Sequence, residues 1–431
     1  MKPTMMLMAM FIVLFASVSN AETLKIDGCT AINSPGHYLI VNDLVNLTAE
    51  TCISITSNNV ILDGDGHSIQ GTPQKFRTGV LIHSPYGIVN VTVRNITVEN
   101  WYYGVYIKKA EDVEISFSKI ANTSRHGIHV SNSTSIQIDS NRLTNNGVGI
   151  SFEGGSEYIV VSNSTIEKNL DGIYIIDSSN GLFERNIIRN NWGGIWISGS
   201  FQIVISNNTI YLNKDGIWIS RSDHNLISNN EIWNNENGIW IFDYSLYNTF
   251  KDNVIYENNL GLKMFNYTTF NTIYNNIFNN TINVELDNTT QNTWNASKSS
   301  GRNIIYGMVI GGNYWAESNN TGYSQICIDV DVDGICDLPY HINNKNIDYL
   351  PLTNIQVAEI VLDSINDSLE QIITKYYPFF DWRTETPTRS DVIQAVVGAV
   401  NLYFSTTDQH LKDSILNDVI LLVQLYFKLP N

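Results

Sequence analysis

The sequence predicts an all-β fold, a parallel β-helix built from coils of about 22 residues. The tetrapeptide Gly-Ile-Trp-Ile occurs three times, at 194–197, 216–219 and 238–241, and each copy begins 22 residues after the last. Apolar and outward-facing residues alternate inside each copy, which is typical of a β-strand with one buried face. A fixed repeat of short strands places equivalent residues in columns along one axis.

A column of glycines gives the register of the coils. The residues one and three positions after each glycine are apolar and should face the interior, so the residue between them should face outward. Two further short strands and turns of Asn, Ser, Asp and Gly complete each coil. A second column is rich in asparagine and should form a hydrogen-bonded ladder. The glycines are Gly79, Gly104, Gly127, Gly149, Gly172, Gly194, Gly216, Gly238 and Gly261, and the ladder is Asn141, Ser164, Asn186, Asn208, Asn230, Asn253 and Asn276.

Composition limits the classes of partner. The net charge of −17 and the pI near 4.8 argue against nucleic acid, which selects basic surfaces. Charged residues make up only 16% of the 431 residues, which excludes a coiled coil or a disordered acidic tail. This excess of negative charge is compatible with binding of metal cations or neutral sugars, or with an acidic extracellular surface.

Several features predict export. Residues 1–21 contain Lys2, an apolar run and a Ser-Asn-Ala end, which predict a signal peptide cleaved after Ala21. No later stretch is long and apolar enough to span a bilayer, so the mature chain should lack a transmembrane segment. We expect a secreted, cell-surface or periplasmic-type location. Thirteen Asn-x-Ser/Thr sequons allow glycosylation, although an Asn-rich chain also produces sequons by chance; they include Asn90, Asn132, Asn207, Asn266 and Asn319.

Four cysteines form two local pairs, which predicts the disulfides Cys29–Cys52 and Cys327–Cys336 in an oxidising compartment. Solenoid ends need covers, because terminal coils expose their core and a strand edge. The domain boundaries that we predict are an N-terminal cap at 22–58, β-helix repeats at 59–291, a C-terminal cap at 292–354 and an α-helical module at 355–431.

The α-helical module follows a change from period-two to helical patterning. Helices are predicted at 357–377, 388–404 and 411–427. They should form a small bundle that caps the chain, dimerises or binds a protein partner.

The chain resembles secreted, NosD-like right-handed parallel β-helix proteins, which are common on archaeal cell surfaces. The resemblance covers roughly residues 24–354 and rests on the coils, on the opening Cys29, Ser-Pro-Gly (34–36) and Cys52, and on Gly-Asn-Tyr-Trp (312–315) with the acidic block that follows. It implies a right-handed helix and a superfamily of carbohydrate-binding proteins and sugar hydrolases. The family name also implies copper.

Copper is not expected for this chain. Only Met264 and Met308 remain as methionines beyond the leader, and the eight histidines are scattered along the sequence. His126 and His129 are close in sequence, and we interpret them as a surface pair.

The outward position of each coil forms the sharpest functional feature. Four successive members are large aromatics, Tyr174, Trp196, Trp218 and Trp240, which predicts an exposed platform that binds sugar rings by stacking. Cross-strand stacking without a ligand, or a covering loop or protein partner, would produce the same pattern. The full column is Tyr106, His129, Ser151, Tyr174, Trp196, Trp218, Trp240, Lys263 and Glu285.

Catalysis on this face would need carboxylates and a base. Glycoside cleavage requires two carboxyls roughly 5–10 Å apart, and a lyase or epimerase requires cations that stabilise negative charge. Aspartate beside glycine is also ordinary turn chemistry. The candidates are Asp171 and Asp215 before their glycines, Asp177 and Asp243 three positions after their aromatics, and the cations Lys214 and Arg221.

An acidic loop predicts a structural Ca²⁺ site. Asp329, Asp331, Asp333 and Asp337 alternate around Gly334 and supply the oxygen ligands that Ca²⁺ favours. The twelfth position of the loop is Tyr340 rather than Glu, and the loop would be closed by Cys327–Cys336 instead of a helix pair. An exposed acidic turn is the alternative.

Together these features predict an exported cell-surface protein that binds glycan through the aromatic column. Two other functions remain open: a polysaccharide lyase, glycoside hydrolase or epimerase on the same face, and a structural surface-layer or adhesin protein. Product release separates the enzyme from the binder, and replacement of the tryptophans separates the binder from the structural protein.

Overall fold

The computed structural model describes residues 23–72, 74–287, 290–354, 392 and 395–399. The described residues form two units, one at 23–294 with 342–347, and one in 295–341 and 348 onward. The predicted signal peptide and the predicted helices at 357–377 and 411–427 lie outside the described residues. Residues 392 and 395–399, inside the predicted helix at 388–404, are helical.

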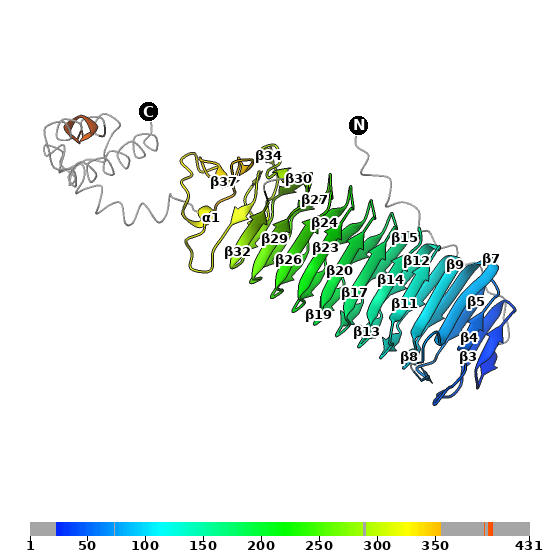
Figure 1. The fold of residues 1–431 in the computed structure, drawn as a ribbon. Coiled ribbons are helices and arrows are strands. Elements are labelled where there is room, and N and C mark those ends of the chain that lie inside the picture. The colour runs from blue at the N-terminus through cyan, green and yellow to red at the C-terminus, as the bar shows by residue number, and fades with distance from the viewer. Residues whose placement is uncertain (1–22, 73, 288–289, 355–391, 393–394, 400–431) are drawn as a thin grey trace. The chain divides into compact units, whose positions relative to one another are not determined.

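The first unit is a right-handed parallel β-solenoid of about 11 turns (Figure 1). Its coils advance by parallel pairing of each strand with the equivalent strand of the next coil, as Ile195 of β20 pairs with Ile217 of β23. The two apolar columns predicted beside the glycines are buried throughout, as Ile195 and Ile197 show at 1% and 0% exposure. The predicted fold is therefore confirmed, and its interior is a stack of mostly aliphatic side chains along one axis.

Three strand columns make the walls of the solenoid. The first carries the glycines: β2 (Thr30–Ile32), β4 (Thr51–Ile55), β7 (Thr78–Arg94), β9 (Tyr103–Ser116), β11 (His126–Ser131), β14 (Val148–Glu153), β17 (Asp171–Ile176), β20 (Gly193–Ser198), β23 (Asp215–Ser220), β26 (Asn237–Phe242), β29 (Leu260–Met264) and β32 (Ile282–Leu286). The long strands β7 and β9 bend into the second column, whose other members are β1 (Leu24–Ile26), β3 (Gly36–Ile40), β5 (Val60–Asp63), β12 (Thr134–Asp139), β15 (Glu157–Ser162), β18 (Leu182–Glu184), β21 (Val204–Ser206), β24 (Leu226–Ser228), β27 (Thr249–Lys251), β30 (Thr269–Tyr274) and β33 (Gln291–Thr293). The third comprises β6 (Ser68–Gln70), β8 (Thr97–Glu99), β10 (Lys119–Ala121), β13 (Arg142–Thr144), β16 (Thr165–Glu167), β19 (Ile187–Arg189), β22 (Thr209–Tyr211), β25 (Glu231–Trp233), β28 (Val254–Tyr256) and β31 (Ile277–Asn279).

Residues 24–55, inside the predicted N-terminal cap, already contain strands of the solenoid. Strand β1 pairs in parallel with β3, β2 with β4, and β3 with β5. The Cys29–Cys52 disulfide joins two segments of this first part. The chain therefore enters parallel pairing almost from the first described residue.

The glycine column exists because successive coils approach too closely for a side chain. A Cβ placed on Gly172 would lie 2.5 Å from the carbonyl oxygen of Gly194, and one on Gly149 would lie 2.5 Å from that of Gly172. The same clash repeats along the column. Glycine is needed here for close backbone approach rather than for a left-handed conformation.

The predicted asparagine ladder is present, and the structure adds two more. Where one asparagine follows another in the repeats, the second usually accepts both the backbone N–H and the side-chain N–H of the first, as Asn208 N and Nδ2 both donate to Asn230 Oδ1 at 3.0 Å. The second ladder is Asn146, Asn169, Asn191, Asn213, Asn235, Asn258 and Asn280, and the third is Asn225, Asn248, Asn271, Asn292 and Asn346. These ladders satisfy backbone groups that the turns leave inside the coils.

The second unit contains short elements around a buried carboxylate. Burial raises the pKa of Asp348 to about 7, although the backbone N–H of Asn313 and the indole N–H of Trp315 donate to it at 2.8 and 2.9 Å. The Cys327–Cys336 disulfide closes the acidic loop, and the described chain holds no free cysteine. Within residues 295–354 the described elements are β34 (Ser299–Ser300), β35 (Val309–Ile310), β36 (Tyr314–Trp315), α1 (Tyr323–Ile326), β37 (Tyr340–Asn343) and β38 (Asn346–Asp348).

Within the described part of the chain, no helix has the length and hydrophobicity that crossing a bilayer requires.

Candidate functional site

Two outward columns on the first strand wall form what we call the outer strip. The inner column of the strip holds the residues just before the glycines, and the outer one holds the predicted aromatic column. Parallel pairing places their members in register from coil to coil, as the sequence predicted for the aromatics. The inner column includes Tyr103, His126, Val148, Asp171, Gly193, Asp215 and Asn237.

The aromatics of the strip do not form the open platform of parallel rings that the sequence suggested. Tyr174 meets Trp196 edge to face, with ring centroids 5.2 Å apart at 89°, and Trp196 meets Trp218 at 87°. All four rings are half-buried. The Nε1 atoms of Trp196, Trp218 and Trp240 are covered and have no hydrogen-bond acceptor among the described residues. Edge-to-face packing explains this, because an indole N–H can point at a neighbouring ring face.

The end of the aromatic column carries a cation. Lys263 Nζ lies 4.8 Å from the centre of the Trp240 ring and 3.9 Å from a carboxylate oxygen of Glu285. Phe242, which the sequence analysis did not select, packs against the Trp218 ring with centroids 4.7 Å apart. The strip therefore presents a mixed aromatic and charged surface.

Two of the predicted catalytic residues meet beside these aromatics. Asp171 and Asp215 occupy the inner column two coils apart, with Gly193 between them. The Oδ1 atom of Asp171 lies 2.7 Å from where a Gly193 Cβ would be, so the carboxyl crosses the glycine in the direction of Asp215. Asn237 donates to Asp215 at 2.6 Å. Glycine at position 193 thus makes room for a carboxyl from the preceding coil.

Burial changes the acidity of both carboxyls. It raises the pKa of Asp171 to about 6, with a further contribution from the negative charge of Asp215. Burial also raises the pKa of Asp215, against the hydrogen bond from Asn237 and the charge of Lys214. The Oδ1 atom of Asp171 has no hydrogen-bond partner among the described residues. The site therefore holds one carboxyl that is partly protonated near neutral pH beside a second carboxyl.

An exposed tryptophan next to this pair was missed by the sequence analysis. Trp192 directly precedes Gly193 and is 48% exposed. Lys214 Nζ lies 4.6 Å from the centre of its ring, so this predicted cation is engaged with an aromatic face. The signal was present, since a tryptophan at a turn has no interior position to fill.

The other catalytic candidates lie elsewhere. Asp177, Arg221 and Asp243 adopt positive φ in the turns that follow the strands, six residues beyond the inner column and roughly 20 Å along the chain. Arg221 pairs with Asp243 at 3.8 Å, an exposed ion pair. The structure does not bring these three residues together with Asp171 and Asp215.

The interpretation of His126 and His129 as a surface pair is wrong, because both imidazoles are buried, at 4% and 7% exposure. Their ring centroids lie 4.7 Å apart, and both rings stack on Tyr103. Burial lowers the pKa of His126 to about 3, and it also lowers the pKa of His129.

The acidic loop gathers three of its four predicted carboxylates. One oxygen each from Asp329, Asp331 and Asp333 lies within 4.8 Å of the others, while Asp337 instead accepts the backbone N–H of Val330 at 3.0 Å. Asp329 is 2% exposed and accepts the backbone N–H of Gly334 at 2.9 Å. Burial raises the pKa of Asp329. Lys298 forms an ion pair with Asp333, so a bound cation would have to displace an ammonium group.

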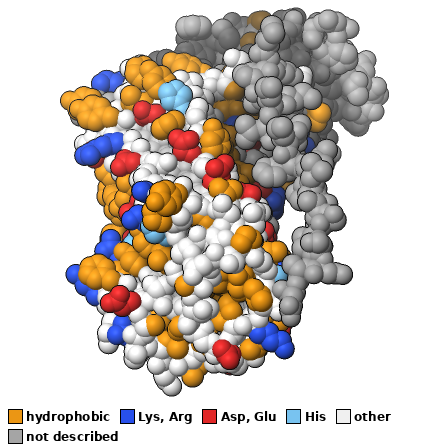
Figure 2. All heavy atoms as spheres, turned by 90° about the vertical axis from the view of Figure 1, so that its right-hand side faces the viewer, with side chains coloured by type: hydrophobic (Ala, Val, Ile, Leu, Met, Phe, Trp, Pro, Cys, Tyr) orange, Lys and Arg blue, Asp and Glu red, His pale blue; other side chains and the backbone are white. Residues whose placement is uncertain are grey.

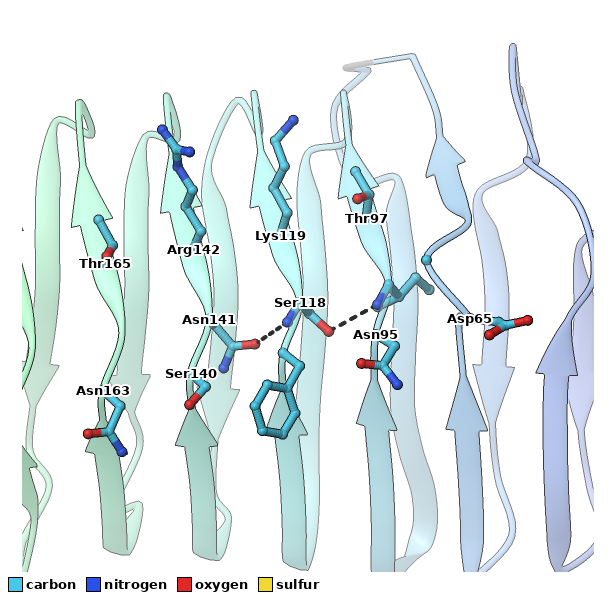
Figure 3. Close-up of a pocket in the computed structure, with 13 residues that line it drawn as sticks. Asp65, Asn95, Thr97, Ser118, Lys119, Ser140, Asn141, Arg142, Asn163 and Thr165 are labelled. Atoms are coloured by element: carbon cyan, nitrogen blue, oxygen red, sulfur yellow. Dashed lines mark hydrogen bonds between the residues drawn. The ribbon is translucent and has the colours of Figure 1, made fainter.

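A groove of about 730 Å³ lies away from the outer strip, over the turns before the third strand column (Figure 3). Lys119 and Arg142 line it, but their charges are already paired with Glu99 and Glu167. The hydrogen bonds in the view connect successive coils, as Asn141 accepts the N–H of Ser118 at 2.9 Å. Figure 2 shows another face, where charged side chains are dispersed among uncharged surface.

Comparisons with protein families agree with the observed β-helix fold. Residues 78–201 match the model described as right handed beta helix region. Residues 156–320 match the model described as periplasmic copper-binding protein (NosD). The chain is therefore a right-handed parallel β-helix protein with a NosD-like segment. Comparison with curated proteins finds no match.

Solved structures similar to this chain include polysaccharide-active β-helices. The A-module of the mannuronan C-5 epimerase AlgE6 from Azotobacter vinelandii is 14% identical, with a TM-score of 0.47 over 63% of this chain and 79% of that one. The periplasmic alginate epimerase AlgG is 15% identical, with a TM-score of 0.47 over 57% and 79%. A GH87 α-1,3-glucanase catalytic domain, solved with tetrasaccharides, is 16% identical, with a TM-score of 0.45 over 63% and 62%.

The NosD-like segment does not fit a copper ion. Among its described residues the only histidine is His224, and no three His, Cys, Asp or Glu side chains converge there. Copper in proteins prefers imidazole, thiolate and thioether ligands. We therefore assign no chemistry to copper in residues 156–320.

Proposed function

We propose that this protein is an exported β-helix protein that binds a polysaccharide along the outer strip. The observation that carries the proposal is the juxtaposition of aromatic rings with two carboxyls, the half-buried Asp171 and the buried Asp215, on one continuous column pair. Sugar rings pack their C–H faces on aromatic side chains, and their hydroxyls donate to carboxylates. Trp192, exposed beside the carboxyls, supplies the most accessible ring face.

Removal of the strip's tryptophans should abolish polysaccharide retention. We expect a Trp196/Trp218/Trp240→Ala variant to bind at least about tenfold more weakly than the wild type, because three aromatic contacts are lost together. The measurement is retention on a panel of immobilised polysaccharides, with the melting temperature confirming that the variant is folded.

The solenoid offers a matched control on a different wall. Tyr211, Trp233 and Tyr256 belong to the third strand column and form a flat stack, with Tyr211 and Trp233 4.5 Å apart at 2°. Their replacement by Ala should leave retention unchanged. Equal loss in both variants would contradict a site on the outer strip, and no retention by the wild type would favour a structural surface-layer or adhesin protein.

A second candidate function, glycoside hydrolysis, is favoured by the acidity of Asp171. A carboxyl with a pKa of about 6 is a suitable general acid, and Asp215 would be the second carboxyl. Their backbones are two coils apart, or roughly 10 Å, and the two carboxyls lie closer than this because that of Asp171 extends across Gly193 toward Asp215. Release of reducing ends from a retained polysaccharide, lost in Asp171→Asn, would establish it.

The pH dependence of the unfolding free energy should reveal the raised pKa of Asp171. The folded-state pKa of Asp171 is raised, so its stabilising contribution is fully present below its ordinary pKa near 3.8 and is lost as the pH rises through about 6. We therefore expect Asp171→Asn to raise the unfolding free energy at pH 7 by about 1–2 kcal/mol, after discounting for solvent screening, but not at pH 3.5. Denaturant unfolding at both pH values measures this. An equal effect at both would show that ionisation is not the cause.

We also propose a structural Ca²⁺ site at Asp329, Asp331 and Asp333, supported by their converging oxygens. Ca²⁺ should raise the melting temperature by several degrees and chelation should reverse this. Asp331→Asn should remove the effect, whereas Asp177→Asn, in an exposed turn, should keep it. Calorimetry without a calcium heat would exclude the site.

Export is supported by the two disulfides, which persist in oxidising compartments. The sequon asparagines Asn90, Asn132, Asn207, Asn266 and Asn319 are all exposed, as glycosylation would require. Mass spectrometry of the mature protein would identify both the N-terminus and any attached glycans.

A further inference from the structure

Two histidines and a glutamate converge on the outer strip, two coils before the first aromatic of the proposed sugar site. We infer that His126, His129 and Glu153 bind a divalent transition-metal ion of the Zn²⁺ type. One ligand atom from each lies within 4.8 Å of the others. Ligands that share a tetrahedral zinc at about 2.1 Å lie roughly 3.4 Å apart, so a modest rotation closes the site. Glu153, with a side chain 32% exposed at the end of β14, is the most exposed member, and its rotation would break the hydrogen bond that it accepts from Ser151 Oγ at 2.8 Å.

Hydrogen bonds already orient His129 as a ligand. Ser151 Oγ donates its only proton to Glu153 at 2.8 Å, so it can only accept from His129 Nδ1, 3.3 Å away. As long as Ser151 donates to Glu153, the proton of His129 lies on Nδ1, which is 4.0 Å from Glu153 Oε1, and the Nε2 lone pair is available. A ligating histidine in proteins is usually held by such a bond from its other ring nitrogen.

His126 supplies the independent observation that points to a ligand. Its side chain is only 4% exposed, and its Nδ1 atom is covered without a hydrogen-bond partner among the described residues. A buried polar atom without a partner is costly unless something binds it. The other nitrogen, Nε2, accepts from Arg125 Nε at 2.8 Å. Because Nε2 accepts this bond, the ring proton lies on Nδ1. Ligation through Nδ1 therefore requires the exposed Arg125 to release Nε2 so that the proton can move there, and the positive charge of Arg125 opposes the metal.

The ligand atoms and the aromatic rings around them determine which class of ion the site would bind. Two imidazole nitrogens and one carboxylate oxygen suit Zn²⁺ rather than Ca²⁺, which takes oxygen ligands. Tyr103 and Tyr106 pack their rings against the histidines and would leave a fourth position for water or a ligand. The site lies before residue 156, so the NosD-like segment does not contain it. It is also separate from the acidic loop, which belongs to the other unit.

Titration of the metal-stripped, tag-free full chain with Zn²⁺ tests the inference. We expect one Zn²⁺ per chain from calorimetry, and Co²⁺ in its place should give visible d–d absorption of a nitrogen-containing site. Glu153→Gln and His129→Gln should each weaken binding more than tenfold. Arg125→Ala should tighten it severalfold, because it removes the opposing charge.

Two matched variants separate this site from others. His224→Gln removes an exposed imidazole that stacks on Tyr247, and His341→Gln removes another exposed imidazole; both should retain full Zn²⁺ affinity. If His129→Gln fails to fold, the more exposed Glu153→Gln decides. Absence of Zn²⁺ binding, or equal weakening by His224→Gln and Glu153→Gln, would overturn the inference.

Discussion

Asn258→Ala should destabilise the solenoid by about 3–5 kcal/mol, because it leaves several buried groups without partners. Asn258 is 1% exposed. Its Oδ1 accepts both the backbone N–H and the side-chain N–H of Asn235, at 2.9 and 3.0 Å. Its Nδ2 donates to the carbonyl of Ile232 at 3.0 Å and to Asn280 Oδ1 at 2.8 Å. Alanine can make none of these bonds.

The neighbouring residue is the control. Asn259 is exposed and has an ordinary negative φ, so Asn259→Ala should change stability by less than about 0.5 kcal/mol. Urea unfolding followed by tryptophan fluorescence compares the two. Similar unfolding midpoints for both variants would show that the ladder contributes little beyond solvent hydrogen bonds.

Gly172→Ala should cost about 2–3 kcal/mol by forcing two coils apart. The added Cβ would lie 2.5 Å from the carbonyl oxygen of Gly194, a backbone atom that cannot move without shifting the strand, and 3.2 Å from Ile188. The cost should appear as a lower unfolding midpoint and faster local hydrogen exchange in β17 and β20.

The matched control for the glycine is Gly28, where an added Cβ meets nothing within 4 Å. Gly28→Ala should be neutral or slightly stabilising, because it reduces the freedom of the unfolded chain. Equal destabilisation of both variants would show that the glycine column reflects backbone conformation rather than close approach.

The arrangement of strands into stacked coils could be predicted because the sequence repeats with a nearly fixed period. Glycine and isoleucine recur at intervals of 22 or 23 residues through most of the repeats, and that spacing determines which residues share a column. The two disulfides could be predicted as well, because each joins cysteines 23 or 9 residues apart. The second and third asparagine ladders carry the same signal, but the sequence analysis followed only one of the three.

The candidate site could be predicted only in part. The period placed Asp171, Gly193 and Asp215 in one column. It could not show that the Asp171 carboxyl extends across Gly193, because this depends on the rotamer of the Asp171 side chain. The spacing also could not show that the aromatic rings are half-buried or that Tyr174, Trp196 and Trp218 pack edge to face. Two partners of Asp348, Asn313 and Trp315, lie 35 and 33 residues away in a segment without a repeat, so no spacing could reveal them.

The sequence by itself determined the coil length, the interior columns, the glycine contacts and the covalent cross-links of this protein, because each follows from a repeat or from pairs close along the chain. Only the tertiary structure decided which outward side chains are buried, how the aromatic rings meet and that His126 and His129 lie beside Glu153. Those features depend on the coils before and after each residue, whose side chains set local solvent exposure, and therefore the pKa and the available hydrogen-bond partners.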